Sequence, residues 1–377
     1  MQKPRLLWIA FKLIDKSENR VVLLQMIERL NQHFDVRLIA GYSKEALELQ
    51  AGGRPVEYYD RHGRIPLKWL RAYISQPSVI KRLIRSEPPA IIFVTHGPSN
   101  RMLRFILKNA RKYGAKVVFD VRTLPGPKNN SRSFKLFSSR LLFASRHFSG
   151  VTYITEEMRR YCIKRFGLPD HKSAVWTSGV DADTFRPADL KPADTPFRLI
   201  YHGGIISAAR GLDRLIQAMD YVKDLDIHLT LISSLREPEA ICWIERLKLQ
   251  DRVTLVDTIP HAQIPAQIQA HHAGILPFPD CDMWNTSSPI KLFEYMACGL
   301  PVIATQIPAH RNVLNGKPFA FFAKDASPQA LAAAIRQAYS QKKRFEELGN
   351  QARAQVLEEH TWNSQAVRLS NFLRSYL

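Results

Sequence analysis

The chain of 377 residues is predicted to be an α/β protein with two Rossmann-like domains facing a central cleft. Two observations lead to this fold class. Short apolar runs that suit buried strands alternate with longer amphipathic stretches that suit helices, and they do so along both halves of the chain. The length also matches two domains of ordinary size, each large enough for its own core. We therefore expect two parallel sheets, each covered by helices.

The composition indicates a cytoplasmic globular protein. Hydrophobic residues make up 45% and charged residues 23% of the chain, and no apolar run reaches the roughly 20 residues needed to span a bilayer. The opening MQKPRLLWIAFKLID has a charge within a short apolar stretch and no small-residue cleavage site, so we expect a first strand rather than a signal peptide. The four cysteines are scattered and no metal-ligand spacing is evident, so we expect neither disulfides nor a metal.

The positive charge is concentrated in the first half of the chain. Residues 1–187 hold 34 Lys and Arg against 15 Asp and Glu, whereas residues 188–377 hold 20 against 19. Such an excess favours an anionic partner, namely a membrane surface, a lipid-diphosphate acceptor or nucleic acid, although a solubilising role is the alternative. Residues 132–148 (RSFKLFSSRLLFASRHF) contain no acidic residue, which suits either a helix on an anionic membrane or a core helix with a basic edge. No nucleic-acid-binding module is recognised, so nucleic acid is not expected.

The first half is predicted to begin with a strand and to alternate from there on. The expected strands are residues 4–10, 34–42, 90–94, 116–120 and 150–155, and the expected helices are residues 18–32, 67–85 (broken near Pro77), 101–113, 132–148 and 156–167.

Two candidate site residues follow strands of this first half. His96 comes directly after the strand at residues 90–94, and Asp120 ends the strand at residues 116–120. Ligands of doubly wound sheets gather at the carboxyl ends of strands, so both are candidate catalytic residues. The alternatives are a loop histidine without function and a structural pairing of Asp120 with Arg122.

Residues 186–196 are rich in Pro and Asp and are predicted to link the domains. The predicted organisation is a first domain at 1–187, a second domain at 188–360 and a terminal segment at 361–377. In the second half we expect strands at residues 198–202, 228–233, 253–256, 273–277 and 302–305, and helices at residues 237–248, 262–271, 289–298, 328–340 and 343–360.

A glycine turn after the strand at residues 198–202 is the first candidate phosphate site. Gly203 and Gly204 follow the strand, and Arg210 lies shortly before the next helix. Glycine allows backbone N–H groups to approach an anion, and the forked donors of arginine suit phosphate oxygens.

The stretch from Ser287 to Thr305 is the second candidate phosphate site. Pro289 suits the first position of a helix, and Gly299 suits the left-handed residue that ends it. Lys291 would then lie beside the free N–H groups of a helix N-terminus, which is a cradle for a diphosphate. Glu294, one turn later, can accept hydrogen bonds from neighbouring ribose hydroxyls. The alternative is an ordinary helix with a solvated Lys and Glu.

The string PIKLFEYMACGLPVIAT resembles the donor-site motif of retaining GT-B glycosyltransferases, especially the large family-four group. The resemblance implies that Glu294 binds the donor ribose, that the turn at Ser288 holds the diphosphate, and that the segment at Ile259 contacts the base. The donor sugar would lie against Thr286 and Ser287. Family members often carry a glutamate where this chain has Thr286.

A second match is TSGVDADTFRP, which resembles the crossover between the domains of the family. The family usually has an arginine where this chain has Gly204 and a lysine where it has Arg210, and it often has a functional histidine at the strand end that matches His96. The glycine-rich loop that usually follows the first strand is replaced by FKLIDKSENR.

The resemblance implies a glycosyltransferase that moves a sugar from a UDP- or GDP-linked donor to a lipid-linked or polysaccharide acceptor in bacterial cell-surface glycan synthesis. It also implies retention of configuration, a first domain that binds the acceptor, a second that binds the donor, and a terminal segment that crosses back to the first domain. Because Lys291 and Arg210 could stabilise the diphosphate, we expect neither a metal nor another cofactor. The basic first half favours a peripheral place on the inner face of the membrane. Two alternatives remain at this stage, a sugar-nucleotide epimerase of the same fold and a non-catalytic partner subunit.

Overall fold

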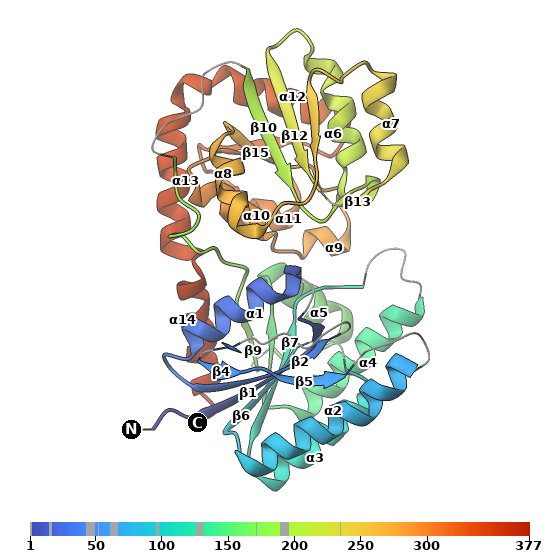
Figure 1. Ribbon diagram of the computed structural model, residues 1–377, viewed down its shortest axis with the longest axis vertical. Helices are drawn as coiled ribbons and strands as arrows, with labels where there is room; N and C mark the ends of the chain where they lie inside the picture. Colours follow the sequence, from blue (N-terminus) through green and yellow to red (C-terminus); the bar gives the residue numbers. More distant parts are fainter. Residues whose placement is uncertain are drawn as a thin grey trace. The chain divides into compact units, whose positions relative to one another are not determined.

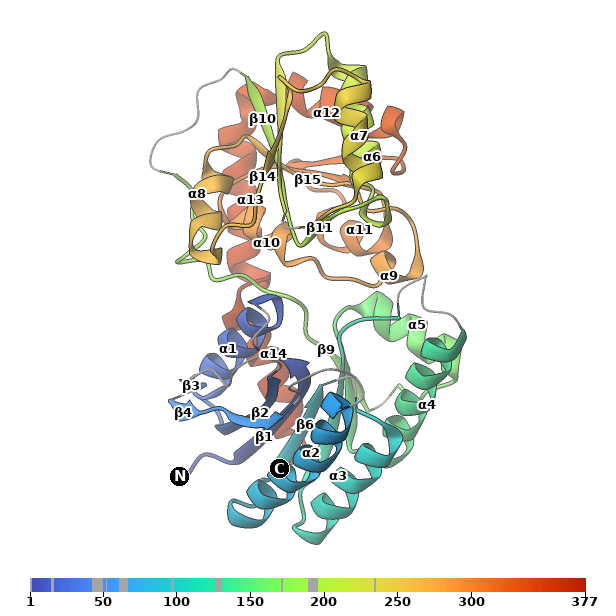
Figure 2. The ribbon, with the colours of Figure 1, turned by 45° about the vertical axis from the view of Figure 1, so that its right-hand side comes forward.

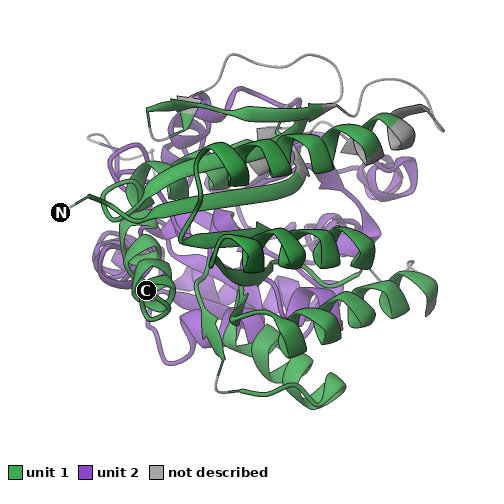
Figure 3. Cartoon of the chain, turned by 90° about the horizontal axis from the view of Figure 1, so that it is seen from below, with its two compact units in different colours: residues 1–177, 362–377 green, residues 178–361 purple. Residues whose placement is uncertain are grey.

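The computed structural model describes residues 2–14, 17–42, 50–51, 53–60, 67–95, 98–125, 131–170, 172–188, 196–233 and 235–377. The chain forms two compact units, which Figure 3 shows in green and purple. The first consists of Met1–Thr177 with Trp362–Leu377, and the second of Ser178–Thr361. Each unit has a parallel sheet covered by helices, so the predicted α/β class is confirmed (Figure 1).

The sheet of the first unit has seven strands in the order β5-β2-β1-β6-β7-β8-β9, and every neighbouring pair is parallel. Residues of the central strands are buried because both faces are covered. The strands are β1 (Arg5–Leu13), β2 (Asp35–Tyr42), β5 (Glu57–Asp60), β6 (Ile91–Thr95), β7 (Lys116–Val121), β8 (Gly150–Tyr153) and β9 (Ser173–Val175), with a small antiparallel pair formed by β3 (Gln50–Ala51) and β4 (Arg54–Pro55).

The helices of the first unit lie in two groups. The chain moves from β1 to β2 in one direction and from β6 to β9 in the other, so right-handed crossovers place the helices on opposite faces. Helices α2, α3 and α4 pack in a row, and α1 packs against α14 (Figure 2). The helices are α1 (Ser17–Leu30), α2 (Leu67–Ser86), α3 (Asn100–Lys112), α4 (Ser131–His147), α5 (Glu156–Phe166) and α14 (Trp362–Arg374).

Helix α2 continues through Pro77, so the predicted break is wrong. A proline inside a helix removes one backbone hydrogen bond and usually kinks or ends the helix. Two serine hydroxyls lie near the gap: Ser75 donates to the carbonyl of Arg71 at 2.8 Å, and Ser78 donates to that of Ile74 at 3.1 Å. Both of these carbonyls precede the proline, and the carbonyl that loses its donor is that of Tyr73, four residues before Pro77.

The second unit has a six-stranded parallel sheet in the order β14-β12-β10-β15-β16-β17. Its strands are β10 (Phe197–His202), β12 (Ile227–Ile232), β14 (Val253–Val256), β15 (Ala273–Leu276), β16 (Val302–Thr305) and β17 (Ala320–Ala323), with a short parallel pair formed by β11 (Ile205–Ile206) and β13 (Leu235–Arg236). Its helices are η1 (Ala208–Arg210, 3₁₀), α6 (Leu212–Ala218), η2 (Asp220–Val222, 3₁₀), α7 (Pro238–Arg246), η3 (His261–Gln263, 3₁₀), α8 (Ile264–Gln269), α9 (Asp282–Asn285), α10 (Ile290–Ala297), α11 (Pro308–Leu314), α12 (Pro328–Ser340), η4 (Lys342–Arg344, 3₁₀) and α13 (Phe345–Glu359).

The second unit begins at Ser178, earlier than the predicted boundary after residue 187. Val180 and Phe185 are buried in its core, and Arg353 donates to the carbonyl of Phe185 at 3.1 Å. Val180 also forms a parallel bridge with Thr361, so the two crossing segments are paired where they enter this unit. The predicted linker belongs to the second unit up to residue 188, and residues 189–195 lie outside the described part of the chain.

In the described ranges no helix combines the length and the apolar composition that crossing a bilayer requires.

The terminal helix α14 should be required for the stability of the first unit. Leu373 is fully buried on this helix, whereas Val367 is 48% exposed. We expect Leu373→Ala to lower the free energy of unfolding of this unit by about 2–5 kcal/mol through a cavity. Val367→Ala on the same helix is the control and should change it by less than about 0.5 kcal/mol. Equal effects in urea unfolding would mean that α14 is not packed as described.

Candidate functional site

The N-terminus of helix α10 lies at the carboxyl edge of the second sheet. The chain leaves β15, passes through α9 and enters α10, whose first N–H groups have no acceptor within the helix. Pro289 lies directly before α10 in extended backbone, with φ −71° and ψ 117°. The helix therefore begins one residue later than predicted, because Pro289 was expected to be its first residue. Gly299 follows the helix at φ 74°, in the predicted left-handed conformation. The positive end of the helix dipole is therefore available at this edge of the sheet.

Two cations from different elements converge on one buried hydroxyl. The hydroxyl of Tyr201, at the end of β10, lies 3.3 Å from Nζ of Lys291 on α10 and 3.5 Å from Nη1 of Arg210 on η1. Burial alone raises the pKa of a phenol, but the charges of Lys291 and Arg210 outweigh it and lower the pKa of Tyr201. Burial also lowers the pKa of Lys291. The structure thus brings together two of the predicted diphosphate ligands.

Gly203 leaves the space that Lys291 occupies. A Cβ at this position would lie 2.7 Å from Nζ of Lys291 and 3.1 Å from the hydroxyl of Tyr201. The backbone N–H of Gly203 donates to the carbonyl of Ile232 at 3.0 Å. This N–H therefore already has a partner in the backbone, and Gly203 leaves room for the cation by the absence of a side chain. Its predicted contact with a diphosphate stays a prediction.

Gly211 fixes the position of Arg210. It has a φ of 72°, and a Cβ there would lie 2.1 Å from the carbonyl oxygen of Pro277. Both the conformation and the close approach require glycine. As a result, η1 lies against the end of β15, and its last residue, Arg210, reaches the cation site.

An aromatic pair lies beneath the cations. The rings of Phe278 and Trp284 stack at 4.3 Å with an angle of 17°. The guanidinium of Arg210 lies 5.2 Å from the Trp284 ring, and the ammonium of Lys291 lies 5.6 Å from the Phe278 ring. Trp284 also donates its indole N–H to the carbonyl of Ala209 at 2.8 Å, which ties α9 to η1. The aromatic faces attract both cations and hold them over the pair.

Glu294 is a buried carboxylate held by two histidines. It is 3% exposed, and its oxygens lie 3.1 Å from Nε2 of His202 and 3.3 Å from Nε2 of His261. Burial raises the pKa of a carboxyl, but the two imidazoles outweigh it and lower the pKa of Glu294 to about 2. The carboxylate is therefore ionised at neutral pH and retains acceptor capacity. Its predicted contact with a ribose stays a prediction.

The three hydroxyl residues before α10 have different partners. Thr286 and Ser287 donate to carbonyls of α9, at 2.7 and 2.8 Å. Ser288 accepts the backbone N–H of Ser178 at 3.1 Å, and its carbonyl accepts the Ser178 hydroxyl at 2.8 Å. These bonds anchor the turn at both ends, while the predicted roles of the three residues in binding the sugar and the diphosphate stay predictions.

Two further predicted positions lie close by. Ile259 is partly buried against the core of the second unit, two residues before His261. Gly204 is half-buried next to Gly203. The predicted base contact of Ile259 and the predicted diphosphate contact of Gly204 remain predictions.

The candidate residues of the first unit are not brought together in the same way. His96 lies outside the described residues. Asp120 is 1% exposed and accepts the hydroxyl of Thr152 at 2.7 Å and the indole N–H of Trp176 at 3.1 Å. Arg122 lies over the ring of Trp176 at 3.6 Å and donates to its carbonyl at 2.8 Å. Asp120 is thus placed to position Trp176, and its predicted catalytic role stays a prediction.

Four contributors to the site were not predicted from the sequence, namely Tyr201, His202, His261 and Trp284. The first two end a buried strand directly before the glycine pair, and alternation along a strand places them on opposite faces of the sheet. The place of Tyr201 and His202 at the end of this strand can be recognised in the sequence alone. The contact of His261 with Glu294 joins residues 33 positions apart and required the fold.

The comparisons with known proteins agree with this geometry. The family described as Glycosyltransferase Family 4 matches residues 20–184, and the family described as Glycosyl transferases group 1 matches residues 196–341. Together they cover most of both units. The chain therefore belongs to the GT-B glycosyltransferases of the family-four type.

Relatives and solved structures extend this assignment. The putative colanic acid biosynthesis glycosyltransferase WcaL of Escherichia coli K12 is 26% identical over 211 residues, which cover 54% of this chain and 51% of that protein. The chain thus spans about half the length of this relative. A phosphatidylinositol N-acetylglucosaminyltransferase subunit from Arabidopsis thaliana is 21% identical over 329 residues, covering 86% of this chain and 71% of that protein.

Anabaena HepE, solved in complex with UDP-glucose, has the same fold. It superposes with a TM-score of 0.74 at 15% identity, covering 98% of this chain and 99% of the other.

The hydroxyl of Tyr201 should contribute measurably to stability. Tyr201→Phe removes the group that Lys291 and Arg210 share, so we expect the free energy of unfolding to fall by about 1 kcal/mol. Tyr221→Phe, which removes a hydroxyl from a side chain at the surface, is the matched control. Urea unfolding of the two variants checks this, and an unchanged value for Tyr201→Phe would contradict the shared role.

The pairing of His261 with Glu294 should stabilise the protein more at mildly acidic pH. The hydrogen bond to Glu294 is the main cause of the raised pKa of His261. Its contribution is therefore fully present below the unfolded pKa of about 6.5 and is lost as the pH rises through the folded pKa. The carboxylate stays ionised across this range because its pKa is lowered to about 2. We expect His261→Gln to lower Tm more at about pH 5.5 than at about pH 8.5, and a pH-independent difference would contradict the pairing.

Proposed function

We propose that this protein moves a sugar from a nucleotide-diphosphate sugar to a lipid-linked or polysaccharide acceptor in bacterial cell-surface glycan synthesis, with retention of anomeric configuration. The observation that carries the proposal is the convergence of Lys291 and Arg210 on the hydroxyl of Tyr201, beside the N-terminus of α10. Glu294 lies one turn further along the same helix. Cations that suit a diphosphate are thus followed by a carboxylate that suits ribose hydroxyls.

The cations would act on the leaving group. When the bond between the sugar and the diphosphate breaks, negative charge grows on the departing nucleoside diphosphate. Lys291 is a half-buried point charge, and Arg210 offers a fork of donors that matches phosphate oxygens. The free N–H groups of α10 add the positive end of a helix dipole. In this proposal these groups do the work that a metal performs elsewhere, and no cofactor is needed.

The donor is proposed to be a UDP-linked sugar first and a GDP-linked sugar second. HepE, which shares the fold, was solved with UDP-glucose, and this supports testing uridine nucleotides first. Glu294 would bind the ribose, the segment at Ile259 the base, and Thr286 and Ser287 the sugar. Gly203, Gly204 and Ser288 would line the diphosphate.

The acceptor is proposed to bind the first unit. The basic excess of the chain lies in residues 1–187, and phosphate-bearing acceptors complement such a charge. The relative in E. coli is named for colanic acid biosynthesis, and the name of the relative in Arabidopsis contains phosphatidylinositol. His96 and Asp120 would lie on the acceptor side. We place the protein at the cytoplasmic face of an anionic membrane, where lipid-linked acceptors are found.

Calorimetric titration of UDP, GDP, ADP and their sugars tests the donor site. We expect one nucleotide to bind at micromolar strength and Glu294→Ala to weaken it by at least roughly tenfold, which corresponds to about 1.4 kcal/mol. Glu294→Gln, which keeps the shape of the buried side chain, should weaken it as well. Glu245→Ala, at an exposed glutamate of the same unit, is the control and should bind like wild type.

Different outcomes separate the alternatives. Failure of every nucleotide to bind would contradict the transferase proposal and favour a non-catalytic subunit. Binding followed by epimerisation of the nucleotide sugar, without transfer, would favour an epimerase. Transfer with inversion, read from the anomeric proton signal of the product, would contradict retention alone.

A further inference from the structure

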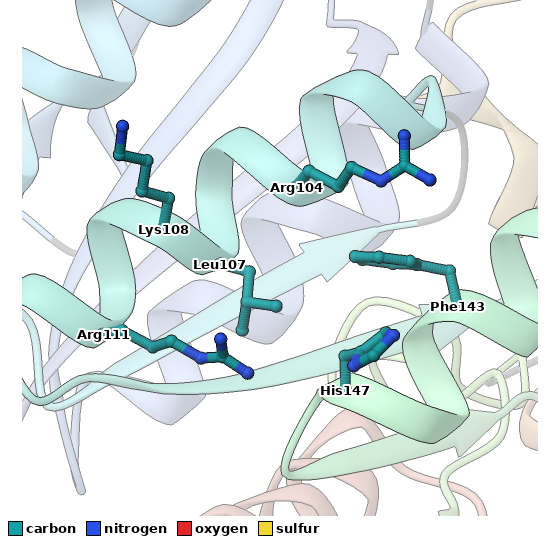
Figure 4. A pocket seen from close by; sticks show the side chains of 6 residues that line it. All are labelled: Arg104, Leu107, Lys108, Arg111, Phe143 and His147. Carbon is teal, nitrogen blue, oxygen red and sulfur yellow. The ribbon is translucent and has the colours of Figure 1, made fainter.

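A basic pocket opens between helices α3 and α4 of the first unit. It has a volume of about 450 Å³, which lies in the range of small-ligand sites. Figure 4 shows Arg104 and Arg111 extending from α3 toward α4, while Lys108 points away from α4. The lining side chains are Arg104, Leu107, Lys108, Arg111, Phe143 and His147.

The cations of this pocket have no acidic partner among the residues that the structure describes. Neither α3 (NRMLRFILKNARK) nor α4 (SRSFKLFSSRLLFASRH) contains an Asp or a Glu. Arg104, Lys108 and Arg111 make no ion pair and no side-chain hydrogen bond with any other residue that the structure describes. By contrast, Arg37 and Arg82 of the same unit are paired with carboxylates. Unpaired cations that line a concave site favour an anionic ligand.

The pocket also offers apolar contact beside its charges. The guanidinium of Arg104 lies 5.7 Å from the centre of the Phe143 ring, and that ring lies 4.7 Å from the His147 ring. Leu107 lies between the two arginines (Figure 4). Leu136, two turns before Phe143 on the same face of α4, is 49% exposed. A ligand that joins a charged group to an apolar part would use both kinds of contact.

The pocket lies away from the edge of the sheet where substrates of such folds bind. Substrates gather at the carboxyl ends of the strands, and α3 and α4 begin there and run back toward the amino ends. The amide of Asn100, at the start of α3, already contacts Ser139 at 2.5 Å. Beyond the contact of Asn100 with Ser139, the pocket extends along the middle and last turns of both helices. It is therefore distinct from an acceptor site at the carboxyl edge.

We propose that the α3–α4 pocket binds the phosphate of an anionic phospholipid headgroup and docks the first unit on a bilayer. Arg104 and Arg111 hold the phosphate through charge-assisted hydrogen bonds, and Lys108 adds charge at the membrane surface. Phe143 and Leu107 contact the glycerol and the first methylenes, and Leu136 reaches the acyl region. This deepens the membrane association proposed above and rests on it, but it does not depend on sugar transfer.

Vesicle flotation with the full chain tests this site. We expect wild type to bind vesicles of phosphatidylcholine with phosphatidylglycerol and not vesicles of phosphatidylcholine alone. The variant Arg104→Ala/Arg111→Ala should bind at least roughly tenfold more weakly, since each cation near an anionic surface contributes measurably. The control Arg85→Ala/Arg165→Ala removes the same charge from exposed positions on other helices and should weaken binding by less than roughly threefold.

A conservative variant and a second readout keep the outcomes separable. Arg104→Lys/Arg111→Lys keeps the charge but loses the fork of donors, so it should recover only part of the binding. Nucleotide binding by the alanine variant should equal that of wild type, which separates this proposal from the donor site of the second unit, and its urea unfolding should match that of wild type, which shows that the first unit is folded. Equal losses in the two alanine variants would overturn the pocket in favour of diffuse attraction. Failure of wild type to bind anionic vesicles, or binding of single-stranded RNA instead, would overturn it too.

Discussion

Two like charges held within reach of one hydroxyl are the constraint on which the second unit depends. Lys291 and Arg210 repel one another, and each charged group has a lower free energy in water than at a half-buried site. The buried phenol of Tyr201 and the aromatic pair of Phe278 and Trp284 reduce that cost without neutralising either charge. The site is therefore left with a positive surplus, which suits a ligand that brings its own negative charge.

Close packing around these cations explains why positions 203 and 211 are glycines and why the turn before α10 is anchored to the rest of the unit. Gly203 leaves room for the ammonium group of Lys291, and Gly211 lets the backbone approach Pro277. These are steric requirements, because a methyl group at Gly203 would collide with Lys291 and one at Gly211 would collide with the carbonyl of Pro277. The turn before α10 is anchored through Ser288 to Ser178, at the point where the chain enters the unit. Backbone contacts therefore fix the geometry of the site, and the charged side chains extend from the backbone positions that these contacts hold.

The two units differ in how their charged side chains are paired. In the second unit Glu294 is satisfied by two histidines, and the overall charge is nearly balanced. In the first unit, the cations of the α3–α4 pocket have no carboxylate on their own helices. Half-buried cations fixed by several contacts favour a small ligand of defined geometry, whereas exposed cations favour an extended anionic surface. This division agrees with a donor site in one unit and docking by the other.

The sequence by itself determined the α/β class, most elements, and the helix that begins after Pro289 and ends before Gly299. These features follow from local rules, namely the period of apolar residues and the backbone preferences of proline and glycine. The same local rules failed at Pro77, where the helix continues although one backbone donor is missing, and at the start of the second unit. Only the tertiary structure decided that Tyr201 joins Lys291 to Arg210, and that His261 reaches Glu294. These contacts join separate elements at the edge of a sheet, and no local pattern encodes the distance between side chains that the chain brings together only by folding.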